Sequence, residues 1–178
     1  MTDNTAQRGR LPATKRIAGF TPDPGIVWPE GHTPGSSRVF AQNSIEIAAT
    51  PEKIWSLLID CQAWPSWYVR CSDVSMLSGG PLLGPDASFR FKTLGFYFEP
   101  RIDTFDPARL LVWSAKGPAG TSGAHAWHIT PLPGGCRVVT EEAQKGLLLA
   151  LIGGRTRKTL LKCHGEWLRA LKELAERR

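Results

Sequence analysis

The chain has 178 residues, of which 42% are hydrophobic and 21% charged, a composition typical of one globular domain with a sizeable core. Its net charge of +6 does not favour a nucleic-acid partner, because the basic residues gather in residues 1–16 and 155–178 and no strand interleaves them with aromatic side chains. No apolar N-terminal segment indicates a signal peptide, and the longest apolar run, residues 147–152, is too short to span a bilayer. We expect a cytoplasmic protein without a transmembrane segment.

Residues 1–36 are rich in proline, glycine and threonine and contain few large hydrophobic side chains. Such a segment cannot build a core of its own, so we predict an N-terminal extension that is partly flexible. Residues 1–16 should be dispensable for folding. The stretch GIVWPEG, residues 25–31, is a candidate to dock on the domain that occupies residues 37–178.

The first predicted elements of that domain are a strand and two short helices. In SIEIAA, residues 44–49, isoleucines alternate with polar residues, as in a half-buried strand. In TPEKIWSLLID, Thr50 suits an N-cap and Pro51 the first helical position. A second short helix is predicted over QAWPSWY, residues 62–68.

About six strands are predicted next. Apolar and polar residues alternate in ASFRFKT, FYFEPRIDTF and LLVWSAK, which glycines and prolines separate. The last two strands form a hairpin over residues 124–142, with Leu132-Pro133-Gly134-Gly135 as a four-residue loop.

A long amphipathic helix is predicted at the C-terminus. Apolar residues recur at three- and four-residue spacing from Leu160 to Ala175, and lysines and arginines lie on the opposite face. Gly153 and Gly154 should kink the helix near its beginning or delay its start. A long apolar helix after a run of antiparallel strands predicts an α+β fold in which the sheet folds around the helix.

The two ends of this domain resemble one family. The segment IEIAATPEKIWSLLIDCQAWPSWY is similar to the opening of the START-like, or SRPBCC, superfamily, which is often described as polyketide cyclase/dehydrase-like. The segment HAWHITPLPGGCRVVTEEAQKGLL, followed by a long helix, is similar to the end of the same domain. The resemblance covers residues from about 38 to 178.

This resemblance implies a helix-grip fold, in which a curved antiparallel sheet of about seven strands wraps around the C-terminal helix. It also implies a deep, mostly apolar cavity between sheet and helix that binds polyketides, aromatic compounds, isoprenoids or lipids. The superfamily shares no universal catalytic motif, so the resemblance assigns no catalytic residue.

The aromatic side chains are numerous for the core of a small domain, and we expect several of them to line the cavity. His164 lies within the apolar stripe of the long helix, whose face forms the cavity floor in this fold. The predicted ligand-binding residues are Trp55, Trp64, Trp67, Phe89, Phe91, Phe98, Trp113, Trp127 and His164.

The hairpin provides the candidate catalytic pair. A four-residue loop pairs His125 with Glu142 on the inner face and turns His128 and Glu141 outward, with His128 in solvent. In an apolar pocket the inner pair should hydrogen-bond, with the carboxylate favouring a charged imidazole. The pair either orients or activates a ligand or only braces the hairpin, and a loop one residue longer or shorter would bring Glu141 inward instead.

The four cysteines show no CxxC spacing and have no histidine at zinc-finger intervals. We expect reduced, buried thiols, with no metal site and no cofactor. These residues are Cys61, Cys71, Cys136 and Cys163.

Three classes of function remain open. The first is a binder of a hydrophobic small molecule, and the sparse titratable residues on the inner faces favour it. The second is a polyketide cyclase or dehydratase that uses the cavity as a mould. The third is an interaction module whose basic helix face contacts a partner. The sequence does not indicate the oligomeric state.

Overall fold

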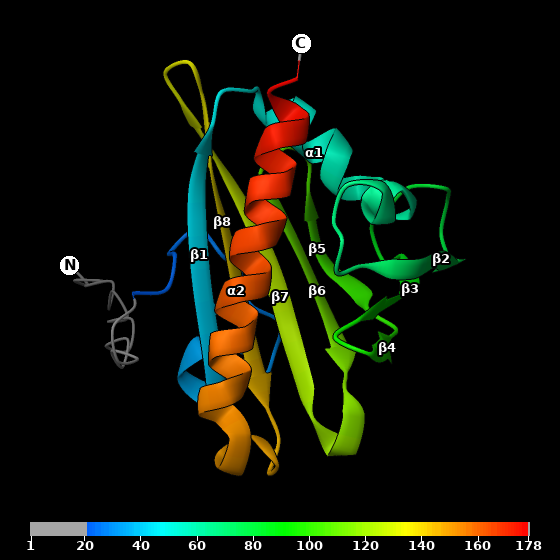
Figure 1. Ribbon diagram of the computed structural model, residues 1–178, viewed down its shortest axis with the longest axis vertical. Coiled ribbons are helices and arrows are strands. Elements are labelled where there is room, and N and C mark those ends of the chain that lie inside the picture. Colours follow the sequence, from blue (N-terminus) through cyan, green and yellow to red (C-terminus); the bar gives the residue numbers. More distant parts are fainter. Residues whose placement is uncertain (1–20, 178) are drawn as a thin grey trace, which may run out of the picture.

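The fold consists of a curved antiparallel sheet and a long C-terminal helix, as the computed structural model of residues 21–177 shows (Figure 1). The prediction about residues 1–16 concerns a part of the chain outside these described residues. The sheet order is β1-β8-β7-β6-β5-β3-β2, with β4 paired to β3. The strands are β1 (Val39–Ile47), β2 (Ser72–Ser78), β3 (Ser88–Thr93), β4 (Phe96–Phe98), β5 (Arg101–Asp106), β6 (Leu110–Lys116), β7 (Ser122–Leu132) and β8 (Gly135–Lys145).

Two short helices follow β1, as the sequence predicts. Helix α1 (Pro51–Ile59) begins at Pro51, and the hydroxyl of the N-cap Thr50 accepts a hydrogen bond from the backbone N–H of Lys53 at 3.3 Å. The second is a 3-10 helix, η2 (Cys61–Ser66). Two further 3-10 turns are η1 (Pro34–Ser36) and η3 (Pro118–Gly120).

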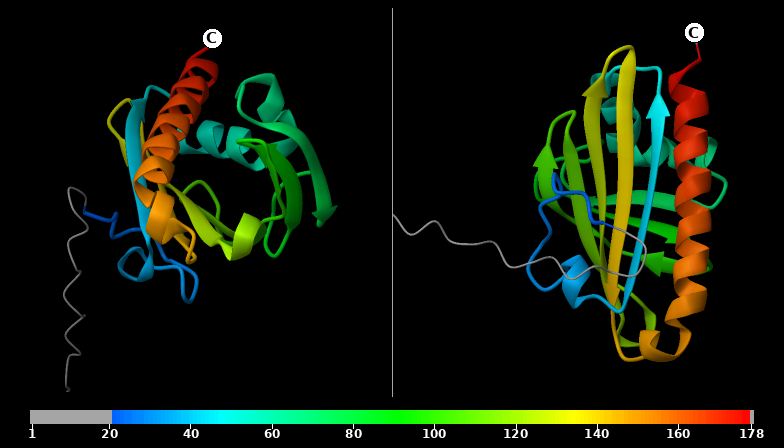
Figure 2. Two further views of the ribbon diagram at one scale, coloured as in Figure 1. Left: turned by 60° about the horizontal axis from the view of Figure 1, so that its bottom comes forward. Right: turned by 90° about the vertical axis from the view of Figure 1, so that its left-hand side faces the viewer.

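Helix α2 (Leu149–Ala175) closes the concave side of the sheet. Figure 2 shows it lying along β1 while the sheet curls away toward α1 and η2. The predicted apolar stripe faces inward, since Leu160, Leu168 and Leu171 are all buried. The α+β helix-grip architecture is thus confirmed, with eight strands among the described residues because β4 adds a short strand to the edge at β3.

The predicted delay in the start of α2 was wrong. The helix begins at Leu149 and continues through Gly153 and Gly154. A Cβ at Gly153 would lie 3.2 Å from Cγ2 of Val39, so the glycine lets the helix pack closely on β1. Gly153 therefore serves packing rather than a break in the helix.

The strand prediction missed β2 and merged two others. β2 is a mostly exposed strand at the edge of the sheet, so its sequence SDVSMLS shows little apolar alternation. Residues 96–105, taken as one strand, are divided into β4 and β5 at Glu99 and Pro100. A proline donates no backbone hydrogen bond and commonly ends strand pairing.

The register of the β7–β8 hairpin is confirmed. Pro131 pairs with Cys136, and His125 pairs with Glu142, as counted outward from the loop. The loop itself is shorter than predicted, because Leu132 and Gly135 also pair. Extending the ladder by one pair leaves every other pairing unchanged, so the faces of the two strands are as expected.

Several of the large aromatic side chains belong to the packed core of the domain. Trp64 is fully buried and makes edge contacts with Phe89, Phe91 and Trp167. Trp127 is also fully buried and contacts Trp167 with ring centroids 5.1 Å apart. These rings fill most of the space between sheet and helix.

The end of the N-terminal extension docks on the convex face of the sheet, as the GIVWPEG stretch led us to expect. Ile26 is buried against Leu110, Val112 and Ala126. Trp28 meets Phe40 edge to face, with ring centroids 6.4 Å apart.

This docking corrects the prediction that His128 lies in solvent. His128 does point away from the concave face, but Asp23 and Gly25 of the extension cover it. Oδ2 of Asp23 lies 3.2 Å from Nδ1 of His128. A Cβ on Gly25 would lie 2.2 Å from Cε1 of the His128 ring, so the backbone passes directly over the imidazole.

The four cysteines are buried and free, as predicted. Burial raises the pKa of the Cys61 thiol to about 12, with a smaller contribution from Asp60. It raises the pKa of Cys71 to about 12 as well. Both side chains therefore remain thiols at neutral pH.

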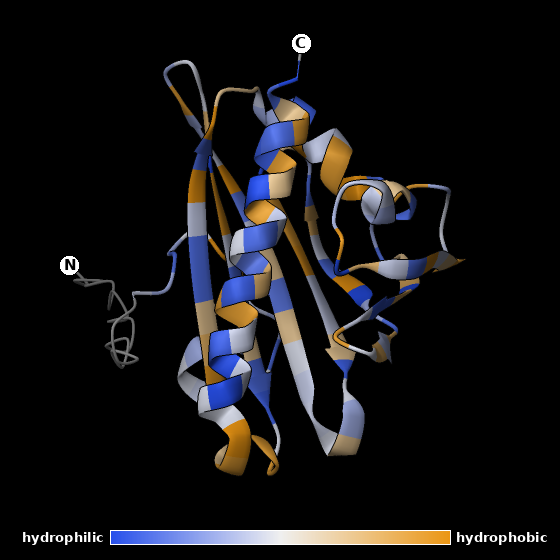
Figure 3. Ribbon diagram, in the orientation of Figure 1, coloured by the Kyte–Doolittle hydropathy of each residue, from blue (hydrophilic) through white to orange (hydrophobic). Residues whose placement is uncertain are grey.

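The surface of α2 is hydrophilic along most of its length, whereas its first turns are hydrophobic (Figure 3). Leu151 in these turns and Leu147 just before the helix are each 86% exposed. Among residues 21–177, none of the helices has the length and apolar character needed to cross a bilayer.

Candidate functional site

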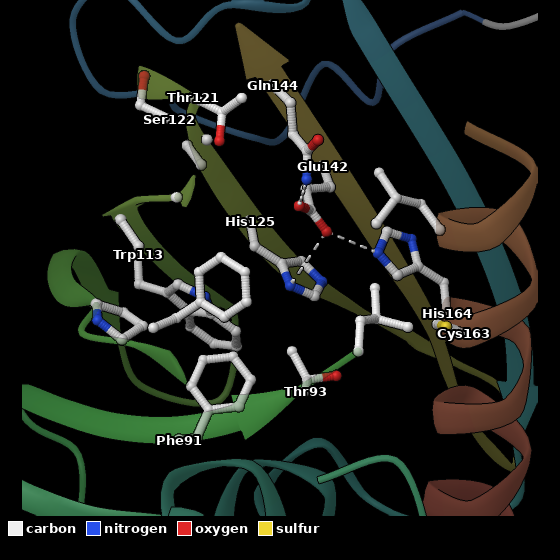
Figure 4. A pocket seen from close by; sticks show the side chains of 18 of the residues that line it. Phe91, Thr93, Trp113, Thr121, Ser122, His125, Glu142, Gln144, Cys163 and His164 are labelled. Carbon is white, nitrogen blue, oxygen red and sulfur yellow. Dashed lines mark hydrogen bonds and ion pairs between the residues drawn. The ribbon is translucent and has the colours of Figure 1, made fainter. Parts of the chain in front are cut away.

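A pocket of about 110 Å³ opens between the sheet and α2. Strands β3, β4, β6, β7 and β8 form one side of it, and α2 forms the other (Figure 4). Aromatic and other apolar side chains make up most of the wall, and its titratable side chains include His125, Glu142 and His164.

Six of the predicted site residues meet at this pocket. Both members of the candidate catalytic pair line it, and so do four of the predicted ligand-binding residues. They are His125, Glu142, Phe91, Phe98, Trp113 and His164.

The other five predicted ligand-binding residues lie outside the pocket wall. Three of them, Trp64, Phe89 and Trp127, are fully buried in the core. Trp55 packs edge to face on Phe105, with ring centroids 5.0 Å apart, and Trp67 is half-buried beside the same core. Parity along a strand gives the face of a side chain but not its depth, and these rings are packed against other rings instead of bordering free space.

Sequence reasoning missed two aromatic residues of the pocket, Tyr68 and Trp167. Their rings stack with centroids 4.4 Å apart and planes 10° apart. The position of Trp167 carried a usable signal, since it lies three residues after His164 and therefore on the same side of α2. Tyr68 follows η2 in a turn, where no periodicity indicates the direction of a side chain.

The polar cluster brings together three strand and helix positions that are distant in sequence. His125 comes from β7, Glu142 from β8 and His164 from α2. Nε2 of His164 lies 3.1 Å from Oε2 of Glu142, and Nδ1 of His125 lies 3.9 Å from the same oxygen (Figure 4). The two imidazoles stack, with ring centroids 4.8 Å apart.

Two neighbouring side chains of β8 hold this cluster in place. The Thr140 hydroxyl is hydrogen-bonded to Nε2 of His125 at 2.6 Å. The Gln144 side-chain amide donates to Oε1 of Glu142. Thr140, Glu142 and Gln144 are spaced two residues apart along β8, so their side chains lie on the same face of the strand. Thr140 and Gln144 can therefore hydrogen-bond to the residues of the cluster.

Glu142 is ionised in this environment. Burial alone would raise the pKa of its carboxyl, but the hydrogen bond from His164, electrostatic interactions with the two imidazoles and the hydrogen bond from Gln144 lower it below the usual value. Since the carboxylate can only accept, Nε2 of His164 is the donor of their hydrogen bond.

His125 is neutral, which corrects part of the prediction for this pair. Burial and then the charge of His164 lower the pKa of His125 to about 3, and the nearby Glu142 offsets only part of this effect. The 3.9 Å separation from Glu142 is also too long for a hydrogen bond. The carboxylate is thus bound by His164, and His125 presents a neutral imidazole to the pocket.

The arrangement offers three kinds of chemistry. The carboxylate can accept a hydrogen bond from a ligand hydroxyl, and a neutral imidazole can accept or donate one. The same two groups can act as acid and base. The cluster can also bind a metal ion, since one ligand atom from each of the three residues lies within 4.8 Å of the others.

The chain belongs to a known family. Residues 38–176 match the family described as "Polyketide cyclase / dehydrase and lipid transport". The fold and the apolar pocket with few polar groups are consistent with the hydrophobic ligand-binding fold of this family.

Relatives in sequence are distant. The uncharacterized protein Rv2574 of Mycobacterium tuberculosis is 27% identical over 107 residues, which are 58% of this chain and 64% of that protein. An uncharacterized protein of Mycobacterium bovis matches to the same extent. The chain therefore spans less than two thirds of the length of the curated relatives that it matches.

Solved structures support the fold alone, at low sequence identity. A hypothetical protein of Helicobacter pylori, jhp0584, has a TM-score of 0.77 and 24% identity, and the match covers 88% of this chain and 99% of that one. A START superfamily protein of Mycobacterium smegmatis has a TM-score of 0.65 and 17% identity over 77% and 97% of the two chains. The di-domain ARO/CYC protein StfQ of the steffimycin biosynthetic pathway has a TM-score of 0.66 and 17% identity over 78% and 51%.

Proposed function

We propose that this protein binds a small, flat, hydrophobic molecule whose hydroxyl or carbonyl group contacts Glu142 and the two histidines. The observation that carries this proposal is the placement of an ionised carboxylate on the wall of a mostly apolar pocket. Apolar pockets with a few convergent polar groups are typical of small-molecule sites, in which the apolar wall supplies affinity and the polar groups fix orientation.

The volume of the pocket restricts the ligand. At about 110 Å³ the pocket is smaller than the deep cavity that the family resemblance implies. The reason is that Trp64, Trp127 and Phe89 fill the middle of the domain. Apolar cavities of about 150 Å³ hold a molecule such as benzene. We infer that one ring enters the pocket and that a larger ligand extends through its mouth beside Leu94, which lines the pocket and is 42% exposed.

Glu142 supplies the selectivity of the proposed site. A hydrogen bond to a charged group contributes about 1.5–3 kcal/mol, so a ligand with a hydroxyl should bind about 10-fold or more tightly than its hydrocarbon analogue. A suitable pair of probes is 2-naphthol and naphthalene, which have the same ring shape. Binding is measured by the change in tryptophan fluorescence, since Trp113 lies on the wall.

Two variants complete the test. Glu142→Gln should weaken 2-naphthol binding about 10-fold and leave naphthalene binding nearly unchanged. The matched control is Glu141→Gln, which alters the neighbouring carboxylate on the opposite face of the sheet and should affect neither probe. Equal binding of both probes to the unaltered protein, or no binding of either at millimolar concentration, would refute the proposal.

Catalysis is the second candidate, and the neutral imidazole of His125 favours it. A neutral imidazole is able to remove a proton from a carbon next to a ketone, and the ionised Glu142 stabilises the imidazolium that forms. StfQ, which shares the fold, is named as a di-domain ARO/CYC protein of a biosynthetic pathway. Turnover of an aromatic poly-β-ketone should then decrease in His125→Ala and Glu142→Gln but not in Glu141→Gln, whereas equal rates in all three would exclude these residues from catalysis.

A further inference from the structure

Each histidine of the pocket cluster has one ring nitrogen without a hydrogen-bond partner among residues 21–177. Nδ1 of His125 has no hydrogen-bond partner within residues 21–177, although it lies on the pocket side of the ring toward Glu142. Nδ1 of His164 is buried and also lacks a partner among these residues. A neutral imidazole nitrogen and a carboxylate oxygen, both facing a cavity, are typical metal ligands.

The remaining polar atoms of His125 and Glu142 form hydrogen bonds of the kind that usually support the ligands of a metal ion. A metal-binding histidine normally donates its second ring N–H to a fixed partner, and a metal-binding carboxylate is itself hydrogen-bonded. His125 has such a partner in the Thr140 hydroxyl, and Glu142 has one in the Gln144 amide. These contacts leave Nδ1 of His125 and Oε2 of Glu142 as the atoms directed at the pocket and at His164.

The three residues lie close enough to bind one ion once the two histidines move toward each other. In a tetrahedral site, two ligand atoms at about 2.1 Å from the ion lie about 3.4 Å apart. Oε2 of Glu142 is already 3.1 Å from Nε2 of His164 and 3.9 Å from Nδ1 of His125. One ligand atom from each of the three residues lies within 4.8 Å of the others, so the two histidine nitrogens need to approach each other by up to about 1.4 Å.

One imidazole ring must also turn, because a nitrogen lone pair lies in the plane of its ring. The rings of His125 and His164 are stacked with their planes 19° apart, and stacked rings do not direct both lone pairs at one point. Thr140 fixes the ring of His125, whereas Nδ1 of His164 forms no hydrogen bond that would oppose rotation. The ring of His164 is therefore the one that turns. Rotation of an imidazole ring about its Cβ–Cγ bond has a broad energy minimum.

We propose that His125, Glu142 and His164 form a site for a first-row divalent transition metal ion on the wall of the ligand pocket. The ion binds Nδ1 of His125, Oε2 of Glu142 and Nε2 of His164, and replaces the proton between the last two atoms. Two imidazoles and one carboxylate suit iron(II), cobalt(II) or zinc(II), whereas calcium and magnesium prefer oxygen ligands alone.

Three protein ligands leave coordination positions open toward the pocket. A metal ion there would polarise a carbonyl or hydroxyl group of a bound molecule, as a Lewis acid does. The site does not depend on the organic ligand, so metal binding and naphthol binding can succeed or fail separately.

Cobalt(II) is the probe for the test, because its visible absorption reports the coordination of the ion. The full chain, stripped of metal with a chelator, is titrated with cobalt(II) alone. We expect one equivalent to bind, with a visible spectrum of nitrogen and oxygen ligands and no sulfur-to-cobalt charge-transfer band. The same titration by NMR should broaden the imidazole signals of His125 and His164 before those of His128 and His32.

Variants locate the ion. Glu142→Gln should weaken cobalt(II) binding by more than the roughly 10- to 100-fold that the loss of an outer partner costs. Thr140→Val, which removes the support of His125 without altering a ligand, should weaken it about 10-fold. The controls, Glu141→Gln and His128→Gln, change a carboxylate and an imidazole on the opposite face of the same hairpin and should leave affinity unchanged.

The NMR titration of the unaltered chain keeps the proposal testable even where a variant does not fold. Absence of cobalt(II) binding at millimolar concentration would overturn it. A charge-transfer band from cysteine, or broadening of His128 or His32 ahead of the pocket histidines, would overturn it as well, because the ion would then be bound elsewhere.

Discussion

The two faces of the β7–β8 hairpin carry the same kinds of residue in opposite surroundings. On the concave face, His125 and Glu142 border a pocket and meet His164 of α2. On the convex face, His128 and Glu141 lie under the N-terminal extension, and Glu141 is 0% exposed. The backbone N–H of Asp23 donates to its carboxylate at 2.6 Å, and the side chain of Gln42 donates to the same oxygen.

The different surroundings shift the pKa values of the two neighbouring carboxyls in opposite directions. Burial raises the pKa of Glu141 to about 7, although the hydrogen bonds from Asp23 and Gln42 act in the other direction. At Glu142 the histidines and Gln144 outweigh burial, and its pKa lies below the usual value. The chain's own extension fills the space over the outer pair, while the inner pair adjoins free volume. Space for a ligand, more than residue type, distinguishes a candidate site from a structural contact.

The largest expected effect on stability comes from removing a histidine from one face of the hairpin or the other. His164 binds Glu142 on the concave side, and His128 binds Asp23 on the convex side. His164→Leu leaves the ionised Glu142 without its main donor, and an unpaired buried charge costs about 3 kcal/mol or more. His128→Leu leaves both hydrogen bonds of Glu141 intact, so we expect a loss of about 1 kcal/mol. Urea unfolding of the two variants measures the difference, and equal losses would show that the inner cluster is no more tightly coupled than the outer one.

A smaller effect is expected from the backbone that covers His128. Gly25→Ala places a methyl group where the imidazole ring now lies, so the segment must lift and Ile26 loses its buried position. The burial of one such side chain contributes about 2 kcal/mol, and this is the expected loss of stability.

Gly35→Ala is the matched control for Gly25→Ala, because nothing lies within 4 Å of a Cβ at that position. It should change stability by less than about 0.5 kcal/mol. Gly25→Ala should also leave the binding of 2-naphthol and cobalt(II) unchanged, since the pocket lies on the other side of the sheet. Loss of either binding activity would mean that the two faces are coupled.

The smallest effect is a pH dependence at His32, where the extension reaches the pocket rim. Nε2 of His32 lies 3.2 Å from Oγ of Ser122, which lines the pocket. Burial and then the charge of Lys145 lower the pKa of His32, against smaller opposing contributions from the Glu30 backbone and from Asp103. Because the folded-state pKa is below the unfolded one, the unfolded chain binds protons first as the pH falls below about 6.5.

The docking of residues 31–36 should therefore weaken slightly below pH 6.5. Hydrogen exchange of this segment at pH 7.5 and 5.5 measures the change. His32→Asn, which has no ionisable group, should show a smaller difference between the two pH values. An equal difference in the variant would assign the effect to another group.

Local sequence patterns predicted most of the fold. The Thr50-Pro51 start of α1, the apolar stripe of α2 and the alternation along β7 and β8 each reflect a repeat or cap whose geometry is fixed by the backbone. The pairing of His125 with Glu142 also followed from the sequence, because a hairpin loop sets the register of both strands. The mostly exposed edge strand β2 gave little signal, since burial produces the apolar alternation.

The sequence by itself determined the α+β fold, the family resemblance, and the side of the hairpin on which each titratable residue lies. Only the tertiary structure decided that His164, and not His125, donates to Glu142, because α2 reaches the pocket from a distant part of the chain. It also decided which tryptophans fill the core and which ones border the pocket, and that residues 23–25 cover His128. The reason is physical: periodicity fixes the direction of a side chain, whereas depth, free volume and proton affinity depend on atoms brought in from other elements.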